Sequence, residues 1–294
     1  MMPVLLKMSD TMFAQFPADH RKELEAMARE AGIDPSLGVL GNTAPDLLKL
    51  AGCATLIVQG NRANGTGPLF GRNLDYPGFG FLHHYSLVTI YRPKGKHAFV
   101  SIGFPGMVGC ISGMNDAGLA LATLEVYTGK DGSPRLDPKG VPYTLTIRRI
   151  LEECTTVAEA EKLLRSVKRT TMNNLAVCDK QGGVVFELTP KSVVARQPVD
   201  NLCACTNHFR SEALATPEEM KCDRYDILDK CRLQATLTLE DIARKLNAAN
   251  QGDLTLQTMI FEPASLRLHL AIGKTPASAL PLKSLDLAPL FSAK

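Results

Sequence analysis

Gly52-Cys53-Ala54-Thr55-Leu56-Ile57-Val58 marks an abrupt change of pattern in this 294-residue chain. Before it, residues 18–31 are strong helix formers that stop at Gly32, and a shorter helical piece follows near residues 44–50. The stretch itself is rich in β-branched and apolar residues, as strands are. The sequence therefore predicts a helical leader over residues 1–52, followed by a domain that begins with a strand.

Residues 53–294 place strands and helices in separate blocks. Strands are expected at 53–58, 69–75, 86–91, 97–104, 108–114, 119–126, 174–178, 184–189, 192–196, 202–206, 258–262 and 266–272. Helices are expected at 144–154, 156–167, 223–233 and 239–249, and a Pro-containing tail follows the last strand. Blocks of this kind favour an α+β domain of antiparallel sheets with helices packed outside.

Composition excludes several classes of protein. The chain is 45% hydrophobic with a net charge of +3, which suits a packed core and gives no reason to expect nucleic acid as a partner. No apolar run approaches the roughly 18 residues of a membrane span. The first residues lack the pattern of a signal peptide, which favours a cytoplasmic location unless the natural start lies upstream. The eight cysteines are scattered and read mainly as free thiols.

Four local features carry chemistry. Cys53 opens a strand directly after Gly52, and Arg72 and Asp75 lie three residues apart near a strand end. Side chains at that spacing point to opposite faces of a regular strand, so they converge only if the chain bends, as Pro77-Gly78 would allow. Glu125 ends an apolar strand, and Asn207 follows another. Each residue alone has an ordinary structural reading, so their order and spacing carry the weight.

Together these features resemble the acyl-CoA:6-aminopenicillanate acyltransferase family, peptidase family C45. More distantly they resemble the choloylglycine hydrolase, N-acylethanolamine acid amidase and acid ceramidase group. The matching elements are a leader with Glu25, Gly32 and Asn42, the Gly52-Cys53 junction, Gly71-Arg72-Asn73-Leu74-Asp75, Gly113-Met114-Asn115-Asp116-Ala117-Gly118-Leu119, Thr206-Asn207-His208-Phe209 and Arg224-Tyr225. The helix that carries Arg224 departs from the family pattern, because Lys221 replaces the usual serine.

The resemblance implies a four-layer αββα sandwich of the N-terminal nucleophile (Ntn) hydrolase class. It also implies that the Gly52–Cys53 bond is cut, so that residues 1–52 are a propeptide and Cys53 becomes the N-terminus of the catalytic domain. The freed α-amine, with a reference pKa of about 7.7–8.0, and the thiol, near 8.5, would then act as base and nucleophile. No cofactor or metal is called for.

Site roles follow from the same resemblance. Arg72 would favour the thiolate, Asp75 would orient the α-amine, and Asn207 would donate to the oxyanion. Glu125 stands where the amidase branch has a glutamate and the bile-salt branch an asparagine, which argues against bile-salt substrates. Arg224 would support the site through ion pairing.

The implied substrate is a linear N-acyl amide, with acyl-CoA as another possible donor, and either water or an amine as acceptor. Residues Phe79, Phe81, Leu82, His83 and Tyr85 are candidates for an apolar acyl pocket, as well as for ordinary core and loop positions. Two other readings stay open. One is a papain-like hydrolase that pairs a cysteine with His208, and the other is a binding protein of the same fold that does not process itself.

Overall fold

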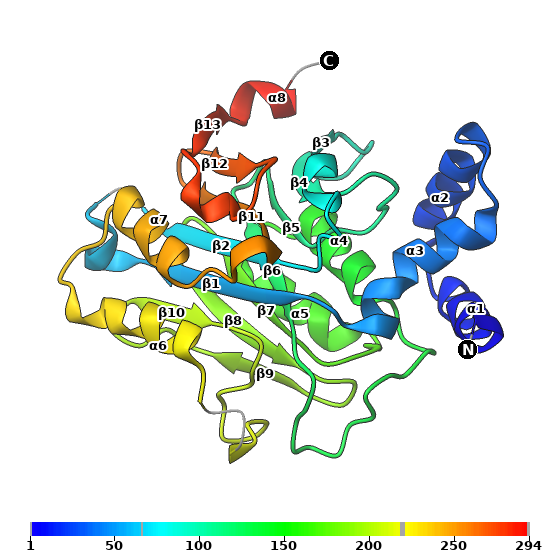
Figure 1. The fold of residues 1–294 in the computed structure, drawn as a ribbon, viewed down its shortest axis with the longest axis horizontal. Helices are drawn as coiled ribbons and strands as arrows, with labels where there is room; N and C mark the ends of the chain where they lie inside the picture. The colour runs from blue at the N-terminus through cyan, green and yellow to red at the C-terminus, as the bar shows by residue number, and fades with distance from the viewer. Residues whose placement is uncertain (1, 66, 218–220, 293–294) are drawn as a thin grey trace.

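Three helices form the leader. The computed structural model describes residues 2–65, 67–217 and 221–292 of the chain. α1 (Met2–Phe13), α2 (Ala18–Glu30) and α3 (Pro35–Leu48) pack together at one end of the molecule, beside α4 (Figure 1). The leader is thus a helical unit set against the rest of the fold.

The helix α3 is longer than the sequence predicted. Asp34 precedes it and accepts a hydrogen bond from Ser36 N, and Pro35 is its first residue. Both are N-terminal signals, so the expectation that a helix begins near residue 44 was wrong by about two turns. The helix ends at Leu48, and Lys49 after it takes a left-handed conformation with φ of 48°.

Two antiparallel sheets follow. The six-stranded sheet has the order β10-β1-β2-β11-β12-β13, and the seven-stranded sheet has the order β3-β4-β5-β6-β7-β8-β9. The first sheet contains β1 (Gly52–Val58), β2 (Leu69–Asp75), β10 (Leu202–Cys205), β11 (Thr255–Glu262), β12 (Arg267–Ile272) and β13 (Lys283–Asp286). The second contains β3 (Leu87–Tyr91), β4 (Phe99–Gly103), β5 (Ser112–Asn115), β6 (Ala120–Glu125), β7 (Asn173–Cys178), β8 (Gly183–Leu188) and β9 (Val193–Arg196).

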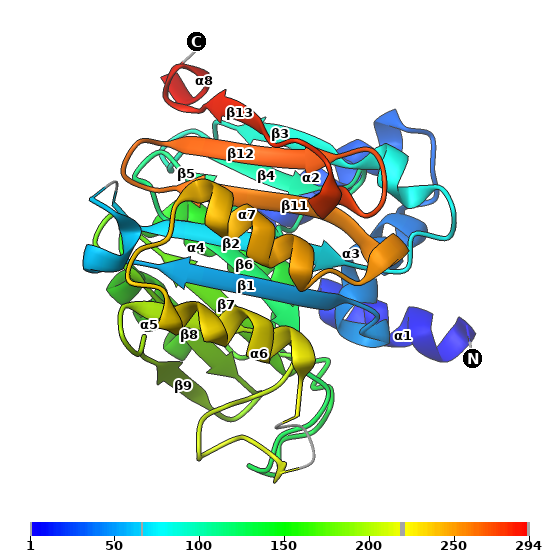
Figure 2. The same cartoon turned by 60° about the vertical axis from the view of Figure 1, so that its left-hand side comes forward.

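Helices cover the outer face of each sheet (Figures 1 and 2). α6 (Asp223–Asp229) and α7 (Leu239–Ala248) cover the first sheet, and α4 (Tyr143–Glu153) and α5 (Val157–Ser166) cover the second. A capping box of Thr156 and Glu159 begins α5, where the sequence predicts a helix over residues 156–167. The predicted αββα sandwich is therefore confirmed.

Separate apolar clusters hold the layers together. Along β1, Ile57 packs between the two sheets, whereas its neighbour Leu56 packs under α6 and α7. The alternation follows from the two-residue period of a strand. Because both faces are covered, all of β2 and nearly all of β1 is buried, and β1 reads as a mostly apolar run instead of an alternating one.

Two stretches differ from the sequence prediction. The expected strand 108–114 is reduced to β5, and residues 108–111 precede it as irregular chain. The tail after β12 contains β13 and α8 (Ala288–Ser292). Both are short, and β13 pairs with β12 along its length, so a tertiary partner defines it and local pattern does not.

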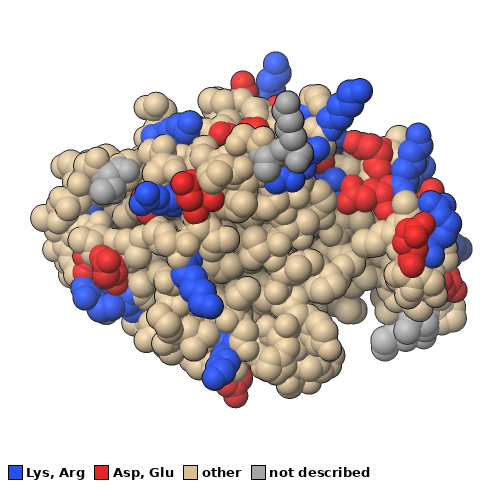
Figure 3. All heavy atoms as spheres, turned by 90° about the horizontal axis from the view of Figure 1, so that it is seen from above, with Lys and Arg blue, Asp and Glu red and all other residues tan. Residues whose placement is uncertain are grey.

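The surface carries mixed charge. On the face shown in Figure 3, basic and acidic side chains are interspersed and separated by uncharged surface. Within the described residues, no helix has both the length and the apolarity needed to cross a bilayer.

Candidate active site

Cys53 is the second residue of β1 and its side chain is buried. The register with β2 sets Cys53 opposite Leu74, and Gly52 opposite Asp75. Burial raises the pKa of the Cys53 thiol, while the charge of Arg72 and the backbone N–H of Asp75 act to lower it. In the uncut chain the thiol is therefore held mainly in its protonated form.

Arg72 lies on β2 and faces the same cavity as Cys53. Its guanidinium is completely buried, and Nη1 donates to Thr123 O at 2.8 Å. Among the described residues, neither Nε nor Nη2 finds an acceptor. Buried, unpaired N–H groups are costly, so this side chain is prepared to bind a thiolate or a substrate oxygen.

Asp75 ends β2 and contacts a different set of groups. Its carboxylate accepts from Thr255 Oγ1 at 2.6 Å and from Gln251 Nε2 at 2.8 Å, and Arg224 Nη1 lies 3.6 Å from it. The side chains of Arg72 and Asp75 do not meet. The irregularity that admits these contacts lies in β11, between Thr255 and Gln257, and not in the bend expected at Pro77-Gly78.

Asn207 holds the peptide groups on both sides of the junction. Its Oδ1 accepts from Cys53 N at 2.8 Å, and its Nδ2 donates to Ala51 O at 3.2 Å and to Glu125 O at 2.8 Å. In this structure the Asn207 amide is thus occupied by backbone groups. Donation to an oxyanion, as expected from the sequence, stays a prediction.

Arg224, on α6, contacts the carbonyl group of Cys53 and the side chain of Asn207. Its Nη1 donates to Cys53 O at 2.6 Å, and its Nη2 donates to Asn207 Oδ1 at 3.0 Å. The contact with Cys53 O places Arg224 within the site, closer to the reacting residue than ion pairing alone would require.

Glu125 holds the segment just before the junction. Its carboxylate accepts from Ala51 N at 2.8 Å and from Tyr143 Oη at 3.2 Å. Burial raises the pKa of Glu125 to about 7. It therefore positions the backbone beside the thiol, and it can carry a proton near neutral pH.

Two further titratable groups, Asp46 and Lys49, hold the end of α3 and the short linker that joins it to β1. The sequence did not predict either of them. Lys49 Nζ donates to Val126 O at 2.6 Å and to Met172 O at 2.8 Å, and burial lowers the pKa of Lys49 to about 8. Asp46 accepts from Thr170 Oγ1, and burial raises its pKa to about 7. Neither residue has a local signal, because their partners lie more than seventy residues away in sequence.

Gly52 is the residue whose carbonyl would be attacked, and its lack of a side chain matters here. A Cβ at this position would stand 2.2 Å from Gln251 Nε2, the atom that donates to Asp75. A larger residue would therefore have to break the Gln251–Asp75 contact.

A cavity of about 190 Å³ opens beside Cys53. Its walls are mostly apolar, and the lining residues are Gly41, Ala44, Pro45, Ala51, Cys53, Arg72, Leu74, Tyr76, Leu82, Phe104, Met107, Ile111, Thr123, Glu125 and Tyr143. Of the residues between 79 and 85 that the sequence suggested for an apolar pocket, Leu82 alone lines the cavity. Phe79, Phe81 and Tyr85 are exposed, and His83 does not reach the cavity either.

The papain-like alternative does not fit this geometry. Cys53 begins a strand, whereas that mechanism places the cysteine at the start of a helix. His208 bonds with Cys222, and this contact helps to lower the pKa of the Cys222 thiol to about 6. A histidine is thus associated with a thiol other than Cys53.

Comparison with known proteins places the fold. The family model of acyl-coenzyme A:6-aminopenicillanic acid acyl-transferase matches residues 61–276, a range that contains Arg72, Asp75, Glu125, Asn207 and Arg224 and begins after the Gly52–Cys53 junction. An uncharacterized protein of Archaeoglobus fulgidus is 28% identical over 122 residues, which span 39% of this chain and 19% of that protein.

Three solved structures share the architecture. They are a conjugated bile acid hydrolase from Clostridium perfringens, an N-acylethanolamine-hydrolyzing acid amidase orthologue from Caenorhabditis elegans, and penicillin V acylase from Agrobacterium tumefaciens. Their TM-scores are 0.54, 0.56 and 0.51 at 14%, 17% and 13% identity. In the same order, the alignments cover 80%, 72% and 80% of this chain and 92%, 93% and 86% of theirs.

At such identities the likeness shows the fold, and the family match extends over most of the chain. The chain has the Ntn-hydrolase fold and belongs to the acyl-coenzyme A:6-aminopenicillanic acid acyl-transferase family.

Proposed function

We propose that this chain cuts its own Gly52–Cys53 bond and then uses Cys53 to take the acyl group from a linear N-acyl amide. The observation that carries the proposal is that two side chains hydrogen-bond to the backbone of Cys53. Asn207 Oδ1 accepts from its peptide nitrogen at 2.8 Å, and Arg224 donates to its carbonyl at 2.6 Å, while the thiol lies in the cavity beside Arg72. Residues 1–52 are then the leader, and residues 53–294 the catalytic domain.

Self-cleavage would proceed as an N→S acyl shift. The Cys53 thiol attacks the Gly52 carbonyl carbon, the C–N bond breaks, and the nitrogen takes a proton to become the α-amine of Cys53. Water then hydrolyses the Gly52 thioester and leaves a carboxylate on Gly52. The contact of Asn207 with the leaving nitrogen, and of Glu125 with Ala51 N, would hold the backbone in place during attack.

Turnover would repeat the same chemistry on a substrate. The α-amine of Cys53 accepts the thiol proton, the thiolate attacks the amide carbonyl, and the amine protonates the departing nitrogen. The unpaired Nε and Nη2 of Arg72 support the proposal, because they can stabilise the thiolate or the developing oxyanion. Water or an amine then receives the acyl group from Cys53, and an acyl-CoA thioester would serve as donor by the same attack.

Trapping the acyl-enzyme tests the proposal. The processed protein, mixed with hexanoyl p-nitroanilide and quenched in acid, is expected to gain the mass of one hexanoyl group on the 53–294 fragment. Peptide mapping should place the group on Cys53. Cys222→Ser is the matched control, since it removes the half-buried thiol near the site and should leave the adduct in place. An adduct on another residue, or amide turnover by Cys53→Ala, would contradict the proposed nucleophile.

A further inference from the structure

The leader supplies one wall of the cavity beside Cys53. Gly41, Ala44 and Pro45 of α3 all line it. Residues three and four apart lie on one face of a helix, so α3 presents a continuous strip to the cavity. Leu82, Phe104 and Ile111 of the catalytic domain also line it.

The residues that line the cavity include a few polar groups and many apolar ones. Arg72 donates to Thr123 O, and Glu125 accepts from Tyr143 Oη and from Ala51 N; these lining residues supply the polar groups of the cavity. The remaining lining residues carry no charged group. An uncharged, apolar group suits those walls, and the reacting carbonyl suits the polar end.

The volume limits how much of that group can be enclosed. The cavity measures about 190 Å³, and an apolar protein cavity of about 150 Å³ is known to hold benzene. An acyl group of about six to eight carbons therefore fills the space. Gly41 is exposed at the rim, so carbons beyond that length would extend toward solvent and gain little further burial.

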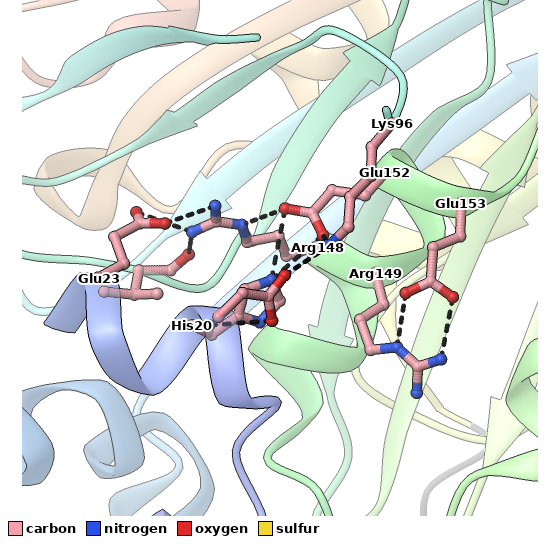
Figure 4. A network of polar contacts seen from close by, with 9 residues as sticks. His20, Glu23, Lys96, Arg148, Arg149, Glu152 and Glu153 are labelled. Atoms are coloured by element: carbon pink, nitrogen blue, oxygen red, sulfur yellow. Dashed lines mark hydrogen bonds and ion pairs between the residues drawn. The ribbon is translucent and has the colours of Figure 1, made fainter. Parts of the chain in front are cut away.

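Contacts that do not depend on the Gly52–Cys53 bond hold the leader on the catalytic domain. Arg148 donates to Glu23 of α2 through Nη2 at 2.7 Å, and His20 of α2 contacts Glu152 at 3.2 Å (Figure 4). Lys49 is buried against two carbonyls of the domain. Cutting the chain after Gly52 removes none of these contacts.

We propose that α3 of the leader stays in place after cleavage and serves as the specificity wall of the acyl pocket, so that the preferred acyl group has about six to eight carbons. The inference rests on the proposed function, in which Cys53 receives that acyl group.

Substitutions at two leader positions can change the shape of this wall. A Cβ added at Gly41 meets no atom within 4 Å, so a leucine there enters open space at the rim. Ala44 is half-buried on the same strip, so a leucine there occupies part of the cavity. Ala31→Leu makes the same chemical change at an exposed leader residue that does not line the cavity, and is the matched control.

The experiment measures kcat/KM of the processed enzyme for straight-chain acyl p-nitroanilides from acetyl through hexanoyl and octanoyl to palmitoyl. Each methylene buried is expected to raise kcat/KM by about fourfold up to hexanoyl or octanoyl, with no rise beyond. In Ala44→Leu the ratio of octanoyl to butyryl turnover should fall by about tenfold or more, because two or more methylenes lose their burial. Gly41→Leu should shift the profile in the same direction, and Ala31→Leu should leave it unchanged.

Three results would overturn the inference. One is a profile in Ala44→Leu and Gly41→Leu equal to that of the original chain. Another is a steady rise to palmitoyl. The third is a processed enzyme that remains active after size-exclusion chromatography has removed residues 1–52. Failure of the proposed function would look different, since no amide would be turned over at any chain length and no acyl group would appear on Cys53. Intact mass of each variant shows whether cleavage has occurred.

Discussion

Asp46, Lys49 and Glu125 bring two buried carboxyl groups and one ammonium to the linker before Cys53. Asp46 Oδ2 is buried and, among the described residues, has no hydrogen-bond partner. Burial raises the pKa of Asp46 and of Glu125 to about 7. A single lysine cannot neutralise both carboxylates, so at least one of them is most stable with a proton bound.

The direction of the pH dependence follows from these pKa values. Asp46 and Glu125 have ordinary values of 3.8 and 4.5, so between about 4 and 7 the folded chain binds more protons than the unfolded chain. Their contribution to stability is therefore complete at low pH and is lost as the pH rises to about 7. Lys49, lowered from 10.5 to about 8, gives the opposite trend, and stability recovers between those values.

The substitution Asp46→Asn measures how much the Asp46 carboxyl group contributes to the pH dependence of stability. An asparagine keeps the Oδ1 acceptor for Thr170 and Tyr143 N but cannot titrate. We expect the fall in unfolding free energy between pH 5 and pH 7 to shrink by about 2 kcal/mol. Urea unfolding in a Cys53→Ala background, which keeps the chain whole, measures it. Equal slopes for the variant and its parent would show that Asp46 does not titrate in this range.

At the residue scale, the sequence points to groups by motif order but gives no sign of their partners. In the structure Asn207 and Arg224 hydrogen-bond to the backbone of Cys53, and Arg72 lines the same cavity as Cys53; their catalytic roles stay predictions. The Asp75 partners Gln251 and Thr255 lie far along the chain, and a bulge in β11 brings them into reach. No local sequence pattern predicts these contacts of Asp75, because they depend on the register between two strands.

At the level of elements, α4 offers two ion pairs with the same spacing and different burial. Arg148 Nε donates to Glu152 at 2.8 Å in a buried pair, whose carboxylate Lys96 also contacts at 2.5 Å. Arg149 Nε donates to Glu153 at 2.8 Å in a pair that is partly exposed to solvent. Figure 4 shows the first pair joined to His20 and Glu23 of the leader and the second pointing away from it.

The two arginines therefore make a matched test of leader docking. Arg148→Ala leaves Glu152 buried with less compensation and Glu23 without its partner, so we expect a loss of about 3–5 kcal/mol in unfolding free energy. Arg149→Ala should cost about 0.5 kcal/mol or less. Thermal or urea unfolding of the uncut Cys53→Ala chain gives both values. Equal costs would mean that the buried cluster does not stabilise the leader on α4.

Most elements could be predicted from periodicity and caps, and the failures share a cause. The helices α2 and α5 and the strands β1 and β2 have strong local signals. The sequence prediction began α3 too late because it left out the N-terminal signal at Asp34-Pro35. It missed β13 because pairing with β12 defines that strand. The part that α3 takes in lining the cavity beside Cys53 could not be predicted, because contact between α3 and the cavity is a tertiary feature.

Across the whole molecule, the structure joins a helical leader and a sandwich at the Gly52–Cys53 junction. Residues on both sides of that bond are fixed: Ala51 by Glu125, and Cys53 by Asn207 and Arg224. On the face seen in Figure 3, side chains of both charges are interspersed, and the net charge of the whole chain is +3. We propose that the thiol of Cys53 cuts this bond.

Intact-mass spectrometry of the purified full-length chain, alongside Cys53→Ala, tests that claim most directly. Self-cleavage by Cys53 should give two fragments, residues 1–52 and residues 53–294 with cysteine at the new N-terminus, and a single uncut chain for the variant. Cleavage of Cys53→Ala at the same bond, or an original chain that stays whole while turning over N-acyl amides, would contradict it.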